Sequence, residues 1–492
     1  MGVFIDLLFP TEIVTDNKRS LTIRRSKIVC TIGPATSSTD RIKQLIMSGM
    51  DVARLNFSHG DHDFHRKIIH TIREMSRDLG KEIGILQDLG GLKIRIGKLP
   101  IQELELKNDD KVVLAPARIN DSSVIPVNYP YIVEDLDVGN RILMADGLVE
   151  LEVEQKEVDR IICRVVVGGI IHSHKGINLP TSNLKISAFT KKDEEDLKMG
   201  LEEGVDFIAQ SFVRHEQDLE PILKILSQCS NVRPLLIGKI EKPQAIQRLD
   251  NILDRVAGVM VARGDLGVEM PLEELPIIQK MIIKKARQSS KPVITATQML
   301  RSMINSPRPS RAEATDVANA ILDGTDSLML SEETTIGAYP VEAVQILDRI
   351  ARATEPLIDQ YSFLHEPISE RLPLTESAVS RSACWLAKDL NAAAIVCCTD
   401  SGSTARLVAR FRPSSPIIGL TPNLYTQRQL TLSWGVIPIL VPSFSDTDEM
   451  FDIARLWTKE LGFARQGDKL IVTAGVPLKT PGTSNLLRVI EV

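Results

Sequence analysis

Three segments, LLIGKIEK (residues 235–242), GVMVARGDLG (258–267) and KPVITATQM (291–299), decide the fold of this chain. Each runs from a β-branched and leucine-rich stretch of strand length directly into polar or charged residues. Strands buried on both faces have such continuous apolar runs, and in parallel barrels the carboxyl ends of the strands carry the catalytic side chains. The segments therefore predict buried parallel strands and an enzyme, not a binding module.

The same alternation of short apolar runs and amphipathic stretches continues on both sides of these segments. Residues 38–49 and 310–324 are typical of the intervening helices, because a serine stands at the start of each and a glycine at its end. The expected strands are SKIVCTI (26–32), DVARLN (51–56), EIGILQD (82–88), VDFIAQSF (205–212), RPLLIGKI (233–240), AGVMVAR (257–263), PVITAT (292–297) and DSLMLS (326–331). Eight strands with helices between them predict an α/β fold, a (β/α)8 TIM barrel.

Two breaks in this alternation, together with the length of 492 residues, predict about three domains. After the third strand the chain alternates with period two and has turn signals, as an antiparallel β insert does, and such an insert can act as a lid over the carboxyl face of the barrel. The expected parts are an N-terminal helical segment (1–24), the barrel (25–88 and 187–356), a β-rich lid domain inserted after strand 3 (89–186) and a C-terminal α/β domain (357–492).

Composition excludes several classes of partner. The net charge is only −5, from 59 basic and 64 acidic residues, so we expect neither nucleic acid nor a membrane surface as a partner. The six cysteines contain no CxxC pair, which favours reduced thiols in the cytoplasm. We expect no signal peptide, because the first residues lack a basic leader, and no membrane-spanning helix, because no run approaches 18 apolar residues.

Polar residues cluster by type at the predicted carboxyl ends of the strands. They are Arg54, Asn56, Ser58 and His59 after strand two, Asp88, Lys93 and Arg95 after strand three, Lys239 and Glu241 on strand five, Asp265 after strand six and Thr297 after strand seven. Acids, a lysine and arginines at one mouth suit a phosphorylated substrate bound with a metal ion.

Two of these groups allow a structural interpretation beside the functional one. Lys239 and Glu241 point the same way on an extended strand, and Asp265 arrives on the neighbouring strand, so the two carboxylates can hold Mg²⁺ or Mn²⁺. A strand-end salt bridge between Lys239 and Glu241 is the alternative. Arg54, on an otherwise apolar strand, requires an anion, which is either a structural carboxylate or a substrate phosphate.

A third group lies in the last domain, where TDSGSTAR (399–406) joins an apolar strand to a helix. Hydroxyls and backbone N–H groups there can cradle a phosphate, although an ordinary helix cap is the commoner use of such a pattern. The candidate phosphate ligands are Thr399, Ser401, Gly402, Ser403 and Thr404. The sequence has no HExxH, no GxGxxG after a strand and no GxxxxGK.

Long motifs in one order cover nearly the whole chain. They are CTIGPAT (30–36), ARLNFSHG (53–60), DLGGLKIRIG (88–97), KGINLP (175–180), GKIEKP (238–243), VARGDLGVEMP (261–271), ITATQML (294–300), PRPSRAEATDVANAILDGTD (307–326) and TAG…GTSN (473–485). With them the chain resembles the pyruvate kinases. The resemblance implies a barrel with a β lid, a C-terminal domain that binds a phosphorylated allosteric effector, and a homotetramer. It also implies the glycolytic transfer of a phosphoryl group from phosphoenolpyruvate to ADP, which yields pyruvate and ATP.

The resemblance also implies a role for each matching residue. Arg54 grips the transferring phosphoryl group, Lys239 stabilises its charge, Thr297 helps to deliver the proton, and the backbone of Gly264 faces the substrate carboxylate. The divalent ion, Mg²⁺ or Mn²⁺, is held by Glu241 and Asp265. The nucleotide contacts are Asn56, His59, Arg95 and Lys175.

The sequence departs from the family pattern where members that require K⁺ have a segment of the type DTKGPEIR. Here Leu89 follows Asp88, and Lys93 occupies the place of the glutamate. Because an ammonium group there supplies a positive charge itself, we predict activity without K⁺, with Asn56, Ser58 and Asp88 as support. Gly90, Leu92 and Glu332 also depart from the pattern, and the two adjacent glycines at 90 and 91 loosen the hinge into the lid.

Two other functions compete with this interpretation. One is a metal-dependent aldolase or lyase acting on pyruvate or a 2-oxo acid, and the other is a catalytically silent regulatory relative. The lid, Lys175 and the C-terminal domain favour the kinase over the lyase. The sequence does not rank sugar bisphosphate, sugar monophosphate and AMP as the effector.

Overall fold

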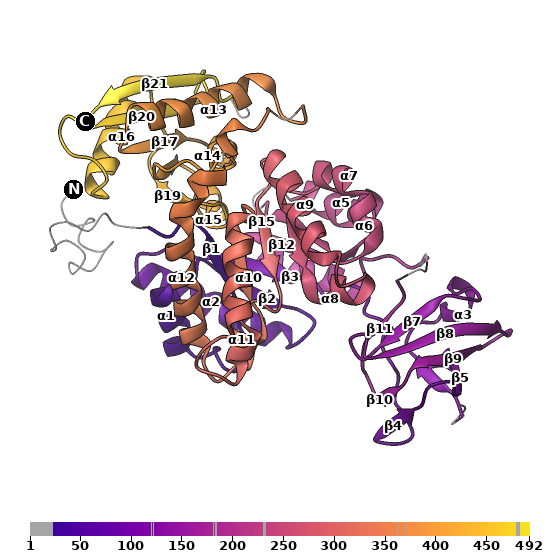
Figure 1. Cartoon of the computed structure of the whole chain (residues 1–492). Helices are drawn as coiled ribbons and strands as arrows, with labels where there is room; N and C mark the ends of the chain where they lie inside the picture. The colour runs from indigo at the N-terminus through magenta and orange to yellow at the C-terminus, as the bar shows by residue number, and fades with distance from the viewer. Residues whose placement is uncertain are drawn as a thin grey trace.

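The computed structural model describes residues 23–119, 121, 123–180, 182, 185–229, 233–361, 363–368, 370–478 and 483–492. Figure 1 shows a central barrel, a small β-rich insert at one side, and a C-terminal sheet with its helices at the other end of the barrel. The helix expected in the first 24 residues lies almost wholly outside the described residues.

The eight expected barrel strands are confirmed. They are β1 (Lys27–Thr31), β2 (Val52–Asn56), β3 (Gly84–Asp88), β12 (Phe207–Val213), β13 (Leu235–Ile240), β14 (Gly258–Ala262), β15 (Val293–Ala296) and β16 (Ser327–Leu330). They close in the order β1-β16-β15-β14-β13-β12-β3-β2, and every neighbouring pair is parallel. All carboxyl ends therefore meet at one mouth.

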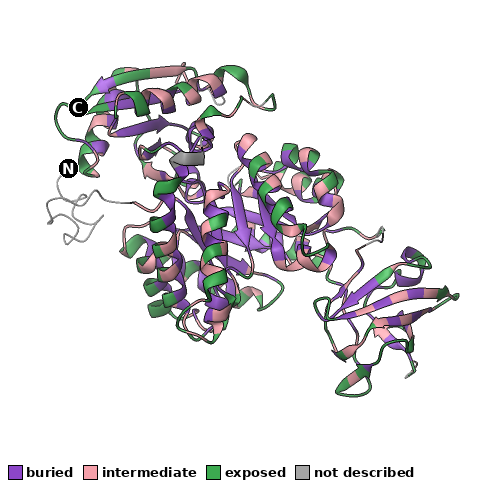
Figure 2. Cartoon of the chain, viewed as in Figure 1, coloured by how far each residue is buried: buried purple, intermediate pink, exposed green. Residues whose placement is uncertain are grey.

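Helices surround the barrel. They are α1 (Thr39–Ser48), α2 (His62–Asp78), α4 (Lys191–Glu202), α5 (Glu220–Ser227), α6 (Pro243–Gln247), α7 (Leu249–Arg255), α8 (Arg263–Glu269), α9 (Leu275–Gln288), α10 (Arg311–Leu322), α11 (Glu332–Thr335) and α12 (Pro340–Thr354), with 3₁₀ turns η2 (Glu216–Leu219), η3 (Arg301–Ile304), η4 (Glu355–Tyr361) and η5 (Phe363–His365). Figure 2 shows buried strands at the centre and exposed residues on the outer faces of these helices. Ser38 and Ser310 accept hydrogen bonds from backbone N–H groups at the starts of α1 and α10, as the sequence predicts.

The insert after β3 has two small sheets. Its elements are β4 (Glu103–Leu106), β5 (Lys111–Pro116), β6 (Ile125–Val127), α3 (Ile132–Asp135), β7 (Arg141–Met144), β8 (Val149–Lys156), β9 (Ile161–Val167), β10 (Gly169–His172) and β11 (Ile177–Asn178). The expectation of a wholly antiparallel, all-β insert needs two corrections, because β5 and β6 are parallel and α3 is a helical turn. The insert has its own core, in which Tyr129 is fully buried.

The C-terminal part is an α/β sheet of five strands. Its elements are α13 (Leu374–Asp389), β17 (Ala394–Cys398), α14 (Ser403–Ala409), β18 (Ile417–Thr421), α15 (Leu424–Leu430), β19 (Val436–Leu440), α16 (Thr447–Glu460), β20 (Lys469–Ala474) and β21 (Leu486–Glu491). The strand order is β19-β18-β17-β20-β21, and only β21 runs antiparallel to its neighbour.

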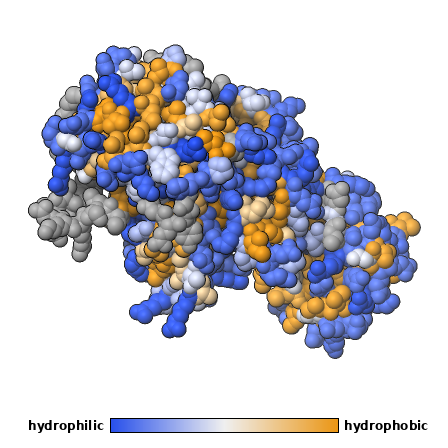
Figure 3. Space-filling view, turned by 45° about the horizontal axis from the view of Figure 1, so that its top comes forward, coloured by the Kyte–Doolittle hydropathy of each residue, from blue (hydrophilic) through white to orange (hydrophobic). Residues whose placement is uncertain are grey.

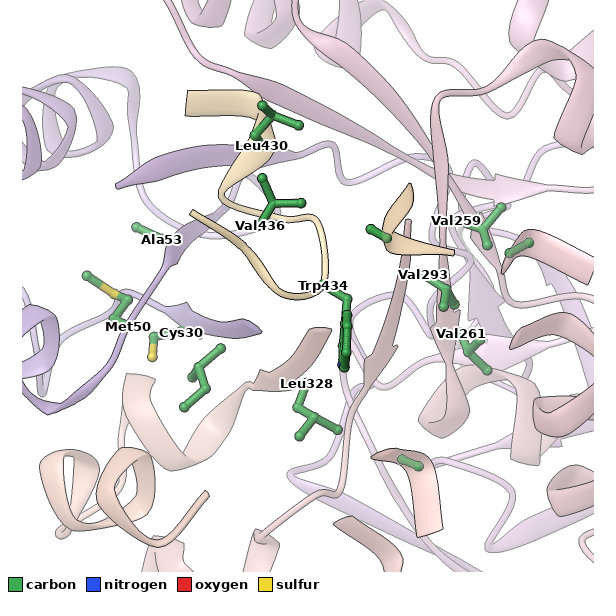
Figure 4. Packing of buried hydrophobic residues seen from close by; sticks show 14 of the residues in the cluster. Cys30, Met50, Ala53, Val259, Val261, Val293, Leu328, Leu430, Trp434 and Val436 are labelled. Atoms are coloured by element: carbon green, nitrogen blue, oxygen red, sulfur yellow. The ribbon is translucent and has the colours of Figure 1, made fainter. Parts of the chain in front are cut away.

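One continuous core joins the barrel to the C-terminal sheet. Figure 4 shows Trp434, on the loop before β19, beside Leu328 of β16, and both belong to the same buried cluster. Trp434 is 1% exposed, so its burial ties the two parts together through apolar area. The cysteines are free thiols, and no helix among the described residues is long and apolar enough to cross a membrane.

Candidate active site

Lys239 is the centre of a buried charge cluster at the mouth of the barrel. Its Nζ lies 2.8 Å from Glu241 Oε1 and 3.2 Å from Asp88 Oδ1, and it donates to Ser211 Oγ at 2.8 Å. Burial by itself lowers the pKa of Lys239, but Asp88 and Glu241 outweigh it, so the pKa is raised. The side chain therefore stays a cation, and the predicted strand-end salt bridge is present.

Arg54 reaches the same cluster from β2. Its Nε donates to Asp88 Oδ2 at 2.7 Å, and its Nη1 donates to Thr31 Oγ1 at 2.9 Å. Asp88 is 1% exposed, and despite burial its pKa is lowered by Lys239 and Arg54. Asp88 is thus a shared counter-ion that holds both cations at the mouth. The structural carboxylate that the sequence suggests for Arg54 is therefore present.

Glu241 lies directly after β13 and is held from two sides. Its Oε2 accepts a hydrogen bond from Phe212 N at 2.8 Å, while Oε1 faces Lys239. Burial is the main reason that the pKa of Glu241 is raised, and the charge of Asp265 adds to it. Phe212 has a φ of 56°, an uncommon value for a bulky residue, so the chain holds this N–H toward the carboxylate at some conformational cost.

Asp265 is the second carboxylate near Glu241. It lies in the first turn of α8 rather than on a strand, because β14 ends at Ala262. Among the described residues no group of three or more metal-ligating side chains exists. Two carboxylates are nevertheless the usual protein share of a Mg²⁺ site, since substrate oxygens and water complete its shell. The donor set therefore fits Mg²⁺ or Mn²⁺.

Thr297 adopts a strained conformation just after β15. Its φ is 66°, which is rare for a β-branched residue. Its Oγ1 accepts from Gly264 N at 2.7 Å and donates to the carbonyl of Ala296 at 2.7 Å. The strain directs the hydroxyl toward the turn that carries Asp265, while the two residues predicted to face the substrate, Thr297 and Gly264, bond to each other.

The segment after β3 brings Arg95 beside the backbone of Lys175 in the insert and near His59 at the end of β2. Arg95 forms a backbone bridge with Gly176, and its Nη1 donates to His174 O at 3.1 Å, so Arg95 and the exposed Lys175 lie on adjacent backbones. His59 is exposed at the end of β2, and burial, Arg95 and Lys93 lower its pKa. No contact joins the side chains of Arg95 and Lys175 among the described hydrogen bonds.

A cavity of about 520 Å³, part of it open to solvent, lies between the insert and the barrel. Lys93, Asn178, Lys242 and Asp265 line it. Asn178 Nδ2 donates to Glu269 Oε1 at 2.7 Å and so joins the insert to α8. The insert therefore contacts the barrel beside this cavity.

The segment predicted to replace a monovalent cation lies beside this cavity. Lys93 is exposed and has no carboxylate within salt-bridge distance in the described part of the chain. Asn56 Oδ1 accepts from Ser58 N at 3.1 Å, and the carbonyl of Leu89 accepts from Ser211 Oγ at 2.7 Å. Asp88 is already neutralised by two cations, so it has less charge to offer a third.

The predicted effector loop lines a separate cavity of about 560 Å³ in the C-terminal sheet, also partly open to solvent. Thr399 Oγ1 accepts from Gly402 N at 3.0 Å, and Gly402 has the φ of 80° that favours glycine. The hydroxyls of Thr404 and Ser484 bond to each other at 2.7 Å, while Ser401 and Ser403 line the cavity.

Three residues at the mouth escaped the sequence reasoning. Ser211 bridges Lys239 and Leu89, and a buried serine in an apolar strand gives no warning of such a role. Lys242 is paired with the buried Glu269. Arg263 donates to the carbonyl of Thr297 at 2.7 Å, and the only available signal was an arginine that ends an apolar strand.

Comparison with known proteins gives a consistent result. Residues 23–344 match the barrel domain of pyruvate kinase, and residues 377–490 match its alpha/beta domain. The chain is 44% identical over 469 residues to the pyruvate kinase of Geobacillus stearothermophilus, covering 95% of this chain and 80% of that protein. It is 46% identical over 473 residues to pyruvate kinase 2 of Synechocystis sp., covering 95% and 79%. A crystal structure of a pyruvate kinase from Cryptosporidium parvum has a TM-score of 0.89 at 36% identity and covers 95% of this chain and 96% of that chain.

Proposed function

Because this chain belongs to the pyruvate kinase family of phosphotransferases, we propose that its barrel mouth transfers the phosphoryl group of phosphoenolpyruvate to ADP with Mg²⁺ or Mn²⁺ and without K⁺. The observation that carries the proposal is the position of Lys239, 2.8 Å from Glu241 and 3.2 Å from the Asp88 that also binds Arg54. Two fixed cations and a second carboxylate at one mouth suit a transferring phosphoryl group better than a carbon–carbon cleavage.

The balanced reaction needs positioning more than covalent chemistry. The phosphoryl group leaves the enol oxygen of phosphoenolpyruvate and joins a terminal oxygen of ADP, giving ATP and enolpyruvate, which takes up one proton at carbon to become pyruvate. Arg54 and Lys239 hold the phosphoryl oxygens, and neither needs to move because Asp88 already orients both. Such preorganised charge lowers the barrier without reorganisation during the reaction.

Glu241 and Asp265 would hold the divalent ion. When bound, the ion supplies positive charge to the phosphoryl and carboxylate oxygens. Burial of Glu241 raises its pKa, so a cation brought beside this carboxylate keeps it ionised. The hydroxyl of Thr297 would position a water molecule, and this water would donate the proton to the carbon of enolpyruvate.

Asn56, His59, Arg95 and Lys175 are proposed to receive the nucleotide. Their support is that Arg95 lies on a backbone adjacent to that of Lys175 and that the charge of Arg95 acts on His59. Closure of the insert as a lid would exclude water and limit hydrolysis of the phosphoryl donor.

Lys93 is proposed to take the place of a monovalent cation. Two observations support this: the Leu89 carbonyl already accepts a hydrogen bond from Ser211, and Asp88 already has two cationic partners. Turnover should therefore be equal in K⁺ and Na⁺ at fixed ionic strength, and Lys93→Glu should introduce a requirement for K⁺. A large stimulation of the unmodified enzyme by K⁺ contradicts this part of the proposal.

The remaining proposals concern effector binding, assembly and location. The cavity at Thr399, Ser401, Gly402, Ser403 and Thr404 would bind the phosphate of an allosteric effector. Large exposed apolar side chains, among them Leu272 and Leu374 at 71% and 72% exposure, support assembly into a homotetramer, and Figure 3 shows apolar patches on the surface. Free thiols support a cytoplasmic location.

The metal site has its own test. We expect Glu241→Gln to raise the Mg²⁺ concentration needed for half-maximal turnover by roughly tenfold or more, since ligand loss of this kind removes one of two carboxylates. Glu269→Gln, which alters a buried carboxylate of the same mouth outside the proposed metal site, is the control. Equal Mg²⁺ dependence in the two variants would exclude Glu241 as a ligand.

A further inference from the structure

A cavity separate from both sites lies where the barrel meets the C-terminal sheet, on the side opposite the mouth. Its volume is about 220 Å³, and residues from the end of α9, the starts of β15 and β16, and α14 line it. Five of its lining residues are basic, and Asp326 is the one acidic residue in the described lining. The cationic residues are Arg287, Lys291, Arg406, Arg410 and Arg412.

The described carboxylates do not neutralise this cluster. Arg412 is paired with Asp326 at 3.1 Å, and Arg287 is paired with Glu366 at 2.5 Å. In the described part of the chain, Lys291, Arg406 and Arg410 have no carboxylate within salt-bridge distance. Several unpaired positive charges at a domain junction are costly unless an anion joins them.

Unsatisfied donors point to the same conclusion. Five buried side-chain polar atoms around this cavity have no hydrogen-bond partner within the described residues. They are Arg287 Nε, Ser290 Oγ, Arg406 Nη1, Arg412 Nε and Ser433 Oγ. Three of these residues, Arg287, Arg412 and Ser433, are at most 4% exposed. Buried hydrogen-bond donors normally have an acceptor. Five unsatisfied polar atoms around one cavity therefore indicate a missing acceptor.

Burial also acts on the charges themselves. It lowers the pKa of Arg406 and of Arg410 to about 10. An anion between them would reverse this destabilisation of the charged form.

We propose that this cavity binds a small tetrahedral oxyanion, either free phosphate or the phosphate group of a small monoester, and that the bound anion clamps the barrel to the C-terminal sheet. The lining offers donors from both parts, and guanidinium groups match phosphate oxygens well.

The two parts already exchange hydrogen bonds across the cavity. Arg287 Nη1 donates to Arg410 O at 3.3 Å, and Arg410 Nη1 donates to Gln288 O at 3.3 Å. An anion held by these side chains would add charge-assisted bonds to the same junction and raise its resistance to separation. The inference does not depend on the catalytic proposal, because none of these residues lines the mouth.

The position of the site can be tested by diffraction from crystals of the full-length protein soaked in selenate, because selenium scatters anomalously. The expected result is a selenium peak between Arg406 and Arg410. Peaks confined to the barrel mouth or to the loop at 399–404 overturn the proposal.

Affinity is measured by calorimetry with inorganic phosphate and, separately, with glycerol phosphate. We expect Lys291→Gln and Arg410→Gln to weaken binding about tenfold or more, as loss of a charged hydrogen bond does, while Arg349→Gln, an exposed arginine on α12, leaves it unchanged. Binding of both compounds identifies any phosphate group as the ligand, and binding of inorganic phosphate alone identifies the free ion. The ammonium of Lys291 makes no described hydrogen bond, so Lys291→Gln removes no such bond from the folded protein. Unchanged affinity in this variant overturns the proposal even if Arg410→Gln does not fold.

Discussion

Replacement of Lys239 by methionine removes the cation on which the charge cluster depends. The side chain keeps a similar length, but Glu241, 1% exposed, retains only the hydrogen bond from Phe212 N, while Asp88 keeps Arg54. Breaking a buried ion pair typically costs about 3–5 kcal/mol of unfolding free energy. Because Arg54 still neutralises Asp88, we expect a loss near the lower bound, about 3 kcal/mol.

The loss should depend on pH in a definite direction. Burial raises the pKa of Glu241, and removal of Lys239 raises it further. A carboxyl whose pKa is raised on folding contributes stability below its unfolded pKa and loses it as the pH rises through its folded pKa. The deficit of Lys239→Met relative to the unmodified protein should therefore grow from acidic to neutral pH, as urea titrations at several pH values would show.

The effect on turnover separates catalysis from stability. We expect kcat to fall roughly 10²- to 10³-fold, as it does when a preorganised donor to a developing charge is removed. Arg73→Met is the matched control, since Arg73 forms a buried pair with Asp206 at 2.8 Å at the opposite end of the barrel. That control should lose stability and keep its kcat. A folded Lys239→Met enzyme with unchanged kcat would refute the role given to this lysine.

Three further predictions address other parts of the molecule. Burial, Arg95 and Lys93 lower the pKa of His59, so its neutral form should persist to lower pH than that of an ordinary histidine. Lys93→Met should raise this pKa toward its ordinary value. An NMR titration of His59 with the same midpoint in both proteins opposes this prediction. Cys229 is the one cysteine that is not fully buried, so it should react first with a thiol reagent in the folded protein, and faster labelling of a buried cysteine counts against the structure. A Cβ at position 200 would lie 2.0 Å from Gln87 Oε1, so Gly200→Ala should lower the unfolding free energy by about 1–3 kcal/mol, and equal urea midpoints would show that Gln87 moves aside freely.

The barrel could be predicted from local patterns because its strands are short, apolar and closed by polar residues. The eight expected segments overlap all eight barrel strands, and the carboxyl ends brought Lys239, Glu241 and Asp265 to one mouth as parallel strands require. Asp265 lies in the first turn of a helix and not on its strand. The pattern of apolar residues does not show this difference, because the helix begins directly after the strand ends.

The contacts within the site were less accessible to sequence reasoning. A salt bridge and a catalytic role are alternatives for Lys239 in the sequence, whereas the structure shows the salt bridges with Asp88 and Glu241. We propose that these salt bridges hold the cation in place for an incoming phosphate. The double role of Asp88 depends on the register of four strands, β2, β3, β12 and β13. The basic cavity at the domain junction joins residues such as Arg287 and Arg410, which are 123 positions apart, and no local pattern announces it.

The central claim is that this mouth moves a phosphoryl group from phosphoenolpyruvate to ADP. The most direct test follows phosphoenolpyruvate and ATP by ³¹P NMR and pyruvate by ¹H NMR, in the purified protein with phosphoenolpyruvate and Mg²⁺, first without and then with ADP. The account predicts no loss of phosphoenolpyruvate before ADP is added, and afterwards ATP and pyruvate in equal amounts. Release of pyruvate without ADP, or its formation without ATP, would contradict it.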